Sequence, residues 1–148
     1  MNSQGKDDGG FKPPLSSMPS DGAQQLESTF APAPMSVPKA RSFVLSADWT
    51  DDDDTKDRLA VITSELVTNA VLHARTTIRV RVTVTRLRIR VGVSDTSTRP
   101  AVVKSYGVAA PTGRGLHVVE ALADRWGVDS TRYGKTVWFE LDQTEQSA

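Results

Sequence analysis

The chain has 148 residues, enough for one domain with a hydrophobic core, and its 18 Lys and Arg residues balance 18 Asp and Glu residues. This balance argues against a general nucleic-acid-binding protein, which usually has a strongly basic domain, and the absence of cysteine excludes disulfides and cysteine metal sites. No apolar run approaches the roughly 18 residues of a membrane span and no secretion signal is present, so we expect a cytoplasmic protein with no direct membrane or nucleic-acid partner.

The first predicted segment, residues 1–27, is rich in Gly, Pro, Ser, Gln and Asp and lacks hydrophobic periodicity. This composition is typical of disorder, so we predict an N-terminal tail. The prolines of the next segment, residues 28–35, permit a short edge strand but forbid a central one. Residues 36–48 then have a helical pattern, with Pro38 near the start of the helix.

A longer helix is predicted from about Asp53 to Ala74. Its core face is defined by apolar residues at helical spacing, Leu59, Ile62, Leu66 and Ala70. Thr50 or Asp51 can cap the N-terminus of this helix. The acidic run at residues 51–54 lies at the positive end of the helix dipole, which explains it as a solvated helix start.

Two strands follow, because apolar and polar residues alternate over residues 78–84 and again over residues 87–93. If Thr85 and Arg86 form a two-residue turn, Val84 faces Leu87 and all the apolar pairs lie on one side. Thr-Arg is a poor sequence for such a turn, so a looser turn is the alternative. The opposite face faces solvent or an acidic partner and carries four arginines, Arg79, Arg81, Arg88 and Arg90.

The rest of the chain is predicted as a long irregular loop at residues 96–112, a helix at 116–124, a hairpin at 125–142 and a polar tail at 143–148. A long loop within a compact domain is typically a lid or a binding loop. The strands come in antiparallel pairs and do not alternate singly with helices. We therefore predict one α+β domain over residues 28–142, a two-layer sandwich with helices on one face of a mixed, mostly antiparallel sheet.

Three polar residues of the long helix, Glu65, Asn69 and His73, are spaced so that they lie on one side of it. Asn69 and His73 lie at the edge of the core face, where an unpaired polar group costs about 1–3 kcal/mol. Either they hydrogen-bond to nearby backbone, or this edge of the helix lines a pocket and they face a ligand.

Two further features favour a pocket. Asp95 ends a buried strand directly before the long loop, where it can accept a hydrogen bond from an exocyclic amine, although Asp is also common in turns. The loop ends with Gly113, Arg114 and Gly115 just before a helix. Glycines let backbone N–H groups approach phosphate oxygens and a helix N-terminus favours anions, but the same segment also serves as an ordinary turn.

Taken in order, the segments ELVTNAVLHA, DTSTRP, GRGLHVVEALADRWGV and GKTVWFEL resemble the ATP-binding domain of gyrase, histidine kinases and MutL, the GHKL ATPase superfamily with its Bergerat-type fold. The resemblance covers about residues 28–142 and is strongest to the anti-sigma-factor serine kinases and their small stand-alone relatives in actinobacteria. It implies ATP and Mg²⁺ as ligands.

The same resemblance implies a role in transcription regulation, as an anti-sigma factor that binds a sigma factor and phosphorylates an anti-anti-sigma protein of the STAS type. Relatives of the kinase branch often form homodimers. The alternative is a nucleotide-loaded binding module without kinase activity. A structural domain that has lost its nucleotide is disfavoured, because Glu65 and Asn69 are both present.

The resemblance assigns a role to each matching residue. Asn69 matches the asparagine that holds Mg²⁺ against the ATP phosphates, and Glu65, one turn earlier, matches the general base. Asp95 matches the aspartate that recognises the adenine amino group. The remaining matches lie beside the nucleotide, at the helix end and at the phosphate-contacting end of the lid: His73, Ala74, Gly113, Arg114, Gly115 and Leu116.

One segment departs from the superfamily pattern. The adenine-binding segment usually reads Asp-x-Gly-x-Gly, whereas Ser97 and Arg99 replace both glycines here. Relatives in the anti-sigma branch often lack these glycines, so the resemblance still implies ATP, with a lid whose local geometry differs.

Overall fold

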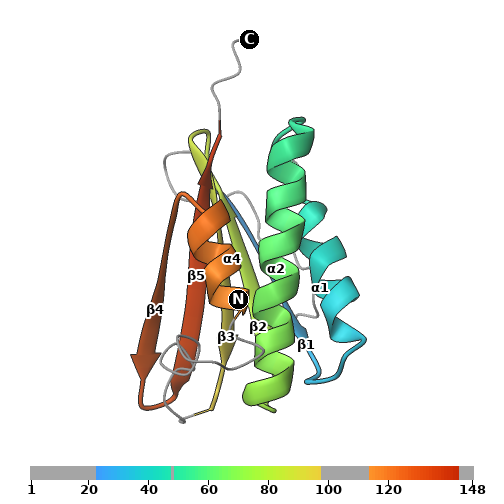
Figure 1. Ribbon diagram of the computed structural model, residues 1–148, viewed down its shortest axis with the longest axis vertical. Coiled ribbons are helices and arrows are strands. Elements are labelled where there is room, and N and C mark those ends of the chain that lie inside the picture. The colour runs from blue at the N-terminus through green and yellow to red at the C-terminus, as the bar shows by residue number, and fades with distance from the viewer. Residues whose placement is uncertain (1–22, 48, 98–113, 144–148) are drawn as a thin grey trace, which may run out of the picture.

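The computed structural model describes residues 23–47, 49–97 and 114–143. Within these residues the elements are, in chain order, β1 Gln24–Phe30, α1 Ser36–Leu45, α2 Asp53–His73, β2 Ile78–Val84, β3 Arg88–Asp95, α4 Arg114–Leu122, β4 Arg125–Thr131 and β5 Gly134–Asp142. The helices cover one face of the sheet (Figure 1).

The strands form a five-stranded sheet in the order β1-β2-β3-β5-β4. Every pairing between these strands is antiparallel, so the sheet is antiparallel and not mixed as predicted. The predicted α+β class, with helices on one face of the sheet, is confirmed. None of the helices in the described ranges combines the length and the apolar character that crossing a membrane requires.

The edge strand lies earlier in the chain than the sequence predicted. It was expected within residues 28–35, but β1 begins at Gln24 and pairs with β2 from Gln24–Val84 to Phe30–Ile78. The strand starts inside the segment predicted as a tail because Leu26 joins the hydrophobic core. The prolines follow the strand and do not interrupt it, while residues 1–22 of the predicted tail lie outside the described ranges.

The cap of α2 also differs from the prediction, which named Thr50 or Asp51. The capping residue is Asp52, whose carboxylate accepts a hydrogen bond from the backbone N–H of Thr55 at 3.0 Å. A cap must reach the third residue of the helix, and Asp52 has that spacing. The hydroxyl of Thr55, and then its N–H, hold the pKa of Asp52 below its usual value.

The hairpin between β2 and β3 has a longer turn than two residues. Val84 pairs with Ile89, not with Leu87, and the hydroxyl of Thr85 accepts hydrogen bonds from the N–H groups of Leu87 and Arg88, both at 3.1 Å. Leu87 is therefore 64% exposed. The two-residue turn was wrong and the looser alternative was right. Because the register shifts by two residues, the remaining side chains keep their predicted faces.

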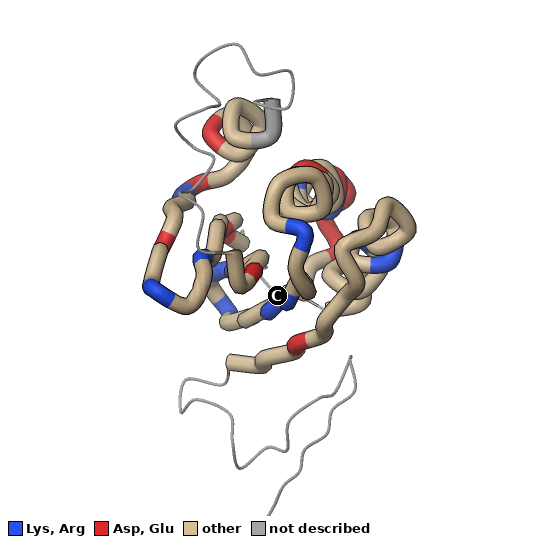
Figure 2. Tube along the Cα trace, turned by 90° about the horizontal axis from the view of Figure 1, so that it is seen from below, with Lys and Arg blue, Asp and Glu red and all other residues tan. Residues whose placement is uncertain are grey.

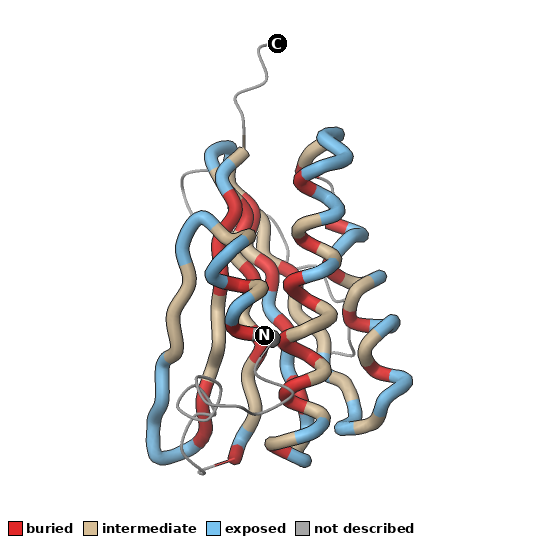
Figure 3. The backbone as a smooth tube through the Cα atoms, viewed as in Figure 1, coloured by how far each residue is buried: buried red, intermediate tan, exposed pale blue. Residues whose placement is uncertain are grey.

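The core fills the space between the helices and the inner face of the sheet (Figure 3). The alternating residues of the strands supply one side of it, as their period of two predicts. Its largest fully buried members from the strands and from α2 are Phe139, Leu141, Ile78, Ile89, Leu59 and Ile62. The opposite face of the sheet has no helix of the described chain on it (Figure 1).

Candidate functional site

The predicted site residues come from elements that meet at one end of the molecule. The C-terminus of α2, the C-terminus of β3, and the start of β5 lie at the lower end in Figure 1. A hydrogen bond from the backbone N–H of Thr96 to the hydroxyl of Thr76, at 3.1 Å, joins the segment after β3 to the segment after α2. Residues distant in sequence are thus brought together at this end.

Asn69 lies on α2 with only 9% of its surface exposed. Its side-chain nitrogen is buried and has no hydrogen-bond partner among the described residues. The two ends of an amide are interchangeable by rotation, so the amide as a whole has unused hydrogen-bonding capacity. A buried, unsatisfied polar group needs an explanation. The observation favours a ligand-facing Asn69 over an amide satisfied by nearby backbone.

Glu65 lies one helical turn before Asn69 and is half-buried. It takes part in none of the ion pairs between described residues. His73, the last residue of α2, is half-buried and has an interaction within the protein, and Ala74 is the buried C-cap. Among the described residues, the polar side of α2 therefore combines a carboxylate without a cationic partner and an unsatisfied amide.

Asp95 is paired with a residue that the sequence analysis did not single out. The ammonium of Lys135 lies 3.2 Å from Oδ1 of Asp95, and the two side chains are only 8% and 6% exposed. The backbone N–H of Ser97 donates to the same oxygen at 2.8 Å. Asp95 and Lys135 are register partners on β3 and β5. Lys135 shares its strand face with Val137, Phe139 and Leu141. A lysine on an apolar strand face was the feature of the sequence that could have identified it as a candidate site residue.

Gly134 allows the β4–β5 turn to pack directly against the end of β3. Its φ is +146°, and a Cβ atom there would lie 2.1 Å from the carbonyl oxygen of Asp95 and 2.8 Å from Cα of Thr96. No other amino acid fits this approach without moving backbone. Gly134 thereby places Lys135 beside Asp95.

The predicted phosphate-contacting end is described only in part. The helix α4 begins at Arg114, two residues before the predicted start, so Arg114 and Gly115 form its first turn. Leu116 is buried in the hydrophobic core, so its side chain packs within the protein. Gly113, Arg99 and the predicted lid from residue 98 onward lie outside the described ranges.

A cavity of about 390 Å³ opens beside the Asp95–Lys135 pair, at the end of the sheet. Its lining includes Asp95, Thr96 and Lys135 together with outer-face residues such as Arg79 and Thr136. Asp95 and Lys135 lie on the helix-facing side of their strands by alternation, whereas much of this lining comes from the outer face. The cavity is therefore an opening next to the pair, distinct from the space between the sheet and the helices.

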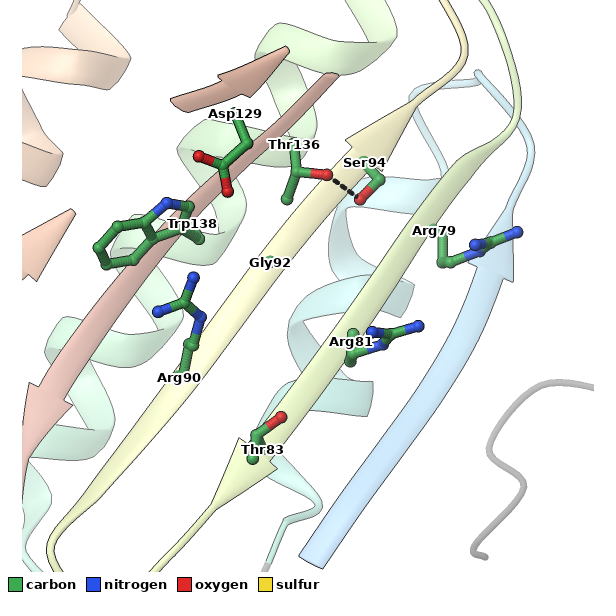
Figure 4. A pocket seen from close by; sticks show the side chains of 9 residues that line it. All are labelled: Arg79, Arg81, Thr83, Arg90, Gly92, Ser94, Asp129, Thr136 and Trp138. Atoms are coloured by element: carbon green, nitrogen blue, oxygen red, sulfur yellow. Dashed lines mark hydrogen bonds between the residues drawn. The ribbon is translucent and has the colours of Figure 1, made fainter. Parts of the chain in front are cut away.

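A second hollow, about 340 Å³ in volume, lies on the outer face of the sheet (Figure 4). Arg79 and Arg81 flank it on β2, and Gly92 leaves its floor open. Trp138 forms another wall, with the Arg90 guanidinium stacked 3.9 Å from the centre of its ring.

The arginines of the outer face are matched by acids of the same face. Glu27 pairs with Arg79 at 3.2 Å and with Arg81 at 3.0 Å. Glu140 pairs with Arg90 at 3.0 Å and with Arg125 at 2.7 Å. Basic and acidic positions are accordingly mixed along the strands (Figure 2). Of the two explanations for these arginines, their roughly half-exposed side chains support a solvated face without requiring an acidic partner, although Glu140 itself is buried.

The pKa values of this network follow from its contacts. Burial alone would raise the pKa of Glu140, but hydrogen bonds from Arg125 and Arg90, with the charge of Arg88, hold it below its ordinary value. The same network raises the pKa of Arg125, chiefly through its hydrogen bonds to Glu140 and Asp142.

The sequence model described as the histidine kinase-like ATPase domain matches residues 30–141, well over half of the chain. None of the curated proteins compared with the chain matches it. The matched span contains α2, the Asp95–Lys135 pair and the start of α4.

Proposed function

We propose, from the premise that this chain belongs to the histidine kinase-like ATPase family, that it is an ATP-binding anti-sigma factor with serine/threonine kinase activity toward an anti-anti-sigma partner. The family membership accounts for ATP binding. The finer assignment comes from the resemblance of its motifs to the anti-sigma kinase branch. The observation that carries the site is Asn69, a buried amide without a hydrogen-bond partner in the described chain, one turn after Glu65.

The residues present fit Mg²⁺ bound together with a nucleotide. Mg²⁺ commonly binds through one or two protein oxygens while substrate phosphates and water supply the rest. Asn69 would give its amide oxygen, and its unused hydrogen-bonding capacity supports that role. Within the described residues, no group of three His, Cys, Asp or Glu side chains is arranged to hold a metal ion, so phosphate oxygens would complete the shell. The ion, when bound, neutralises charge on the phosphates.

Glu65 is the proposed general base. Phosphoryl transfer depends mainly on positioning and charge stabilisation. The oxygen of a partner's serine or threonine hydroxyl would bond to the γ-phosphorus, while the bond from that phosphorus to the bridging oxygen breaks and ADP leaves. Glu65 would accept the hydroxyl proton. A half-buried carboxylate outside every ion pair of the described residues is available for this task.

The two ends of the nucleotide have different proposed partners. Asp95 would accept a hydrogen bond from the exocyclic amine of adenine at the end of β3. The N-terminus of α4, with the backbone of Arg114 and Gly115 in its first turn, would face the phosphates, because a helix N-terminus favours anions. The sigma factor, the STAS-type partner and a homodimer are proposed from the resemblance alone.

Titration calorimetry of Asn69→Ala with ATP, with and without Mg²⁺, tests the site. We expect Mg²⁺-dependent ATP affinity to fall at least about tenfold, which corresponds to loss of one charge-assisted contact of about 1.4 kcal/mol or more. Thr68→Ala, at the adjacent half-buried position of α2, is the matched control and should bind as the parent does. Circular dichroism should show both variants folded. An Asn69→Ala protein with parental Mg·ATP affinity would make Asn69 a structural amide.

A further inference from the structure

The buried pair of Asp95 and Lys135 carries an inference beyond the motif match. We propose that Lys135 is a second base-recognition residue beside Asp95, and that the pair selects nucleotides whose base presents an amino group next to an unprotonated ring nitrogen. This inference rests on the proposed nucleotide site at the same end of the molecule. It concerns how that site distinguishes one nucleotide from another.

Both members of the pair are buried. Its side chains are 6% and 8% exposed, and their strand neighbours on the same face include Val93 and Val137. Removing two charges from water is expensive, and apolar residues of similar volume commonly give equal or greater stability at such a position. Fold stability alone therefore does not account for an ammonium there, whereas recognition of a polar ligand does.

Among the described contacts, the pair also keeps unused hydrogen-bonding capacity. The hydrogen bonds that Asp95 accepts from Lys135 and Ser97 both end on Oδ1. A carboxylate has two acceptor oxygens and an ammonium has three donors. Within the described contacts, Oδ2 of Asp95 and two N–H groups of Lys135 remain available to a ligand.

The order of acceptor and donor in the pair matches one kind of base edge. The pair places an acceptor and a donor side by side, with 3.2 Å between Nζ and Oδ1. Adenine presents a matching edge, in which its 6-amino group donates and the adjacent N1 accepts. Hypoxanthine and guanine reverse both roles, since O6 accepts and N1–H donates. With Asp95 facing position 6 and Lys135 facing position 1, a keto purine would place its O6 acceptor against the Asp95 carboxylate. Its N1–H donor would face the Lys135 ammonium, so neither hydrogen bond could form.

The deciding experiment compares three nucleotides on the unmodified chain by titration calorimetry: ATP, 1-deaza-ATP and inosine triphosphate. In 1-deaza-ATP a C–H replaces N1 while the amino group stays. We expect it to bind at least about tenfold more weakly than ATP, because the charged donor of Lys135 loses its acceptor. Inosine triphosphate should bind about 10³-fold more weakly or worse, because polar sites reject mismatched edges strongly.

The variant Lys135→Met assigns the effect to its residue. In this variant ATP should bind more weakly, and ATP and 1-deaza-ATP should bind equally. Lys39→Met, an exposed lysine of α1, is the matched control and should keep the parental difference between the two nucleotides. If Lys135→Met does not fold, the nucleotide comparison on the unmodified chain still decides.

The outcomes separate this inference from the proposed function. Equal affinities of the unmodified chain for ATP and 1-deaza-ATP overturn the role of Lys135 and leave the nucleotide site standing. Equal weakening of both nucleotides by Lys135→Met also overturns it, because Lys135 would then only support Asp95. Failure of the unmodified chain to bind any of the three nucleotides overturns the proposed function itself, and the inference with it.

Discussion

The two faces of the same sheet use charge in opposite ways. On the outer face, arginines such as Arg79 and Arg81 keep 56% and 54% of their side chains exposed while they share Glu27. On the helix-facing side, Asp95 and Lys135 form a pair that is almost entirely removed from water. Exposed pairs are worth little and are screened by salt, whereas a buried charge must be paired. A charged residue on the inner face is therefore much more informative about function.

The largest expected difference is between helix α2 and the outer face of the sheet, and it concerns the proposed phosphoryl transfer. Glu65→Gln keeps the size of the side chain but removes its basicity, so transfer should fall by about 10²–10⁴-fold while ATP binding persists. Glu27→Gln makes the same change on the outer face and should leave transfer unchanged. Labelled ATP and a panel of anti-anti-sigma domains provide the assay.

Two results would change this assignment. Full transfer by Glu65→Gln removes Glu65 from the mechanism. A parent chain that binds ATP and a sigma factor yet phosphorylates no domain of the panel identifies the nucleotide-loaded binding module.

Two glycines provide the next comparison. Gly134→Ala places a methyl group 2.1 Å from a backbone oxygen at φ +146°, and we expect it to lower the free energy of unfolding by about 3 kcal/mol or more. At Gly92 on the outer face, a Cβ would meet only the methyl group of Thr136, at 3.3 Å. Gly92→Ala should cost below about 1 kcal/mol. Urea unfolding measures both, and similar costs would contradict the close approach of the β4–β5 turn.

The buried and exposed ion pairs should also differ in their contribution to the free energy of unfolding, by somewhat less than the two glycines do. Lys135→Met leaves the Asp95 carboxylate buried without its cation, so we expect a loss of about 3 kcal/mol in unfolding free energy. Arg81→Met removes a cation that is half exposed and should cost below about 1 kcal/mol. Equal losses in urea unfolding would mean that solvent reaches the inner pair as easily as the outer one.

The smallest expected effect is the acid sensitivity of the outer network. The folded-state pKa of Glu140 lies below its ordinary value of 4.5, so its contribution to stability is present above that value and is lost as pH falls through the lower, folded-state pKa. Glu140→Gln should therefore lose stability less steeply than the parent below about pH 4.5. Urea unfolding at a series of acidic pH values checks this, and parallel curves would argue against it.

Periodicity in the sequence predicted which faces are buried but not how strands align. Alternation over β2 and β3 identifies the inner face, yet a shift of two residues leaves that alternation intact, so the pairing of Val84 with Ile89 could not be distinguished from a pairing with Leu87. The start of β1 was missed because its few apolar residues, such as Leu26, give a weak pattern next to a polar segment.

The spatial arrangement of the candidate site residues was predictable where a motif lies on one helix and less so where it spans strands. Glu65 and Asn69 are separated by one turn, so helix geometry alone places them together. Lys135 meets Asp95 only through the pairing of β3 with β5, which no local pattern specifies. The sequence shows that Lys135 lies on an apolar strand face, but it does not show that Asp95 is its partner.

The pairing of β3 with β5 also determines when the proposed binding site forms during folding. Asp95 and Lys135 are 40 residues apart in the chain. Pairing of β1 with β2 closes an even longer loop, from Phe30 to Ile78. Pairings of high sequence separation form late and slowly, because loop-closure entropy opposes them first. Helix α2 with its Glu65 and Asn69 can form early, whereas the Asp95–Lys135 pair, the proposed base-recognition half, forms only when β5 pairs with β3. A nucleotide can thus stabilise only the nearly complete fold, and adding ATP should slow unfolding while leaving the refolding rate unchanged.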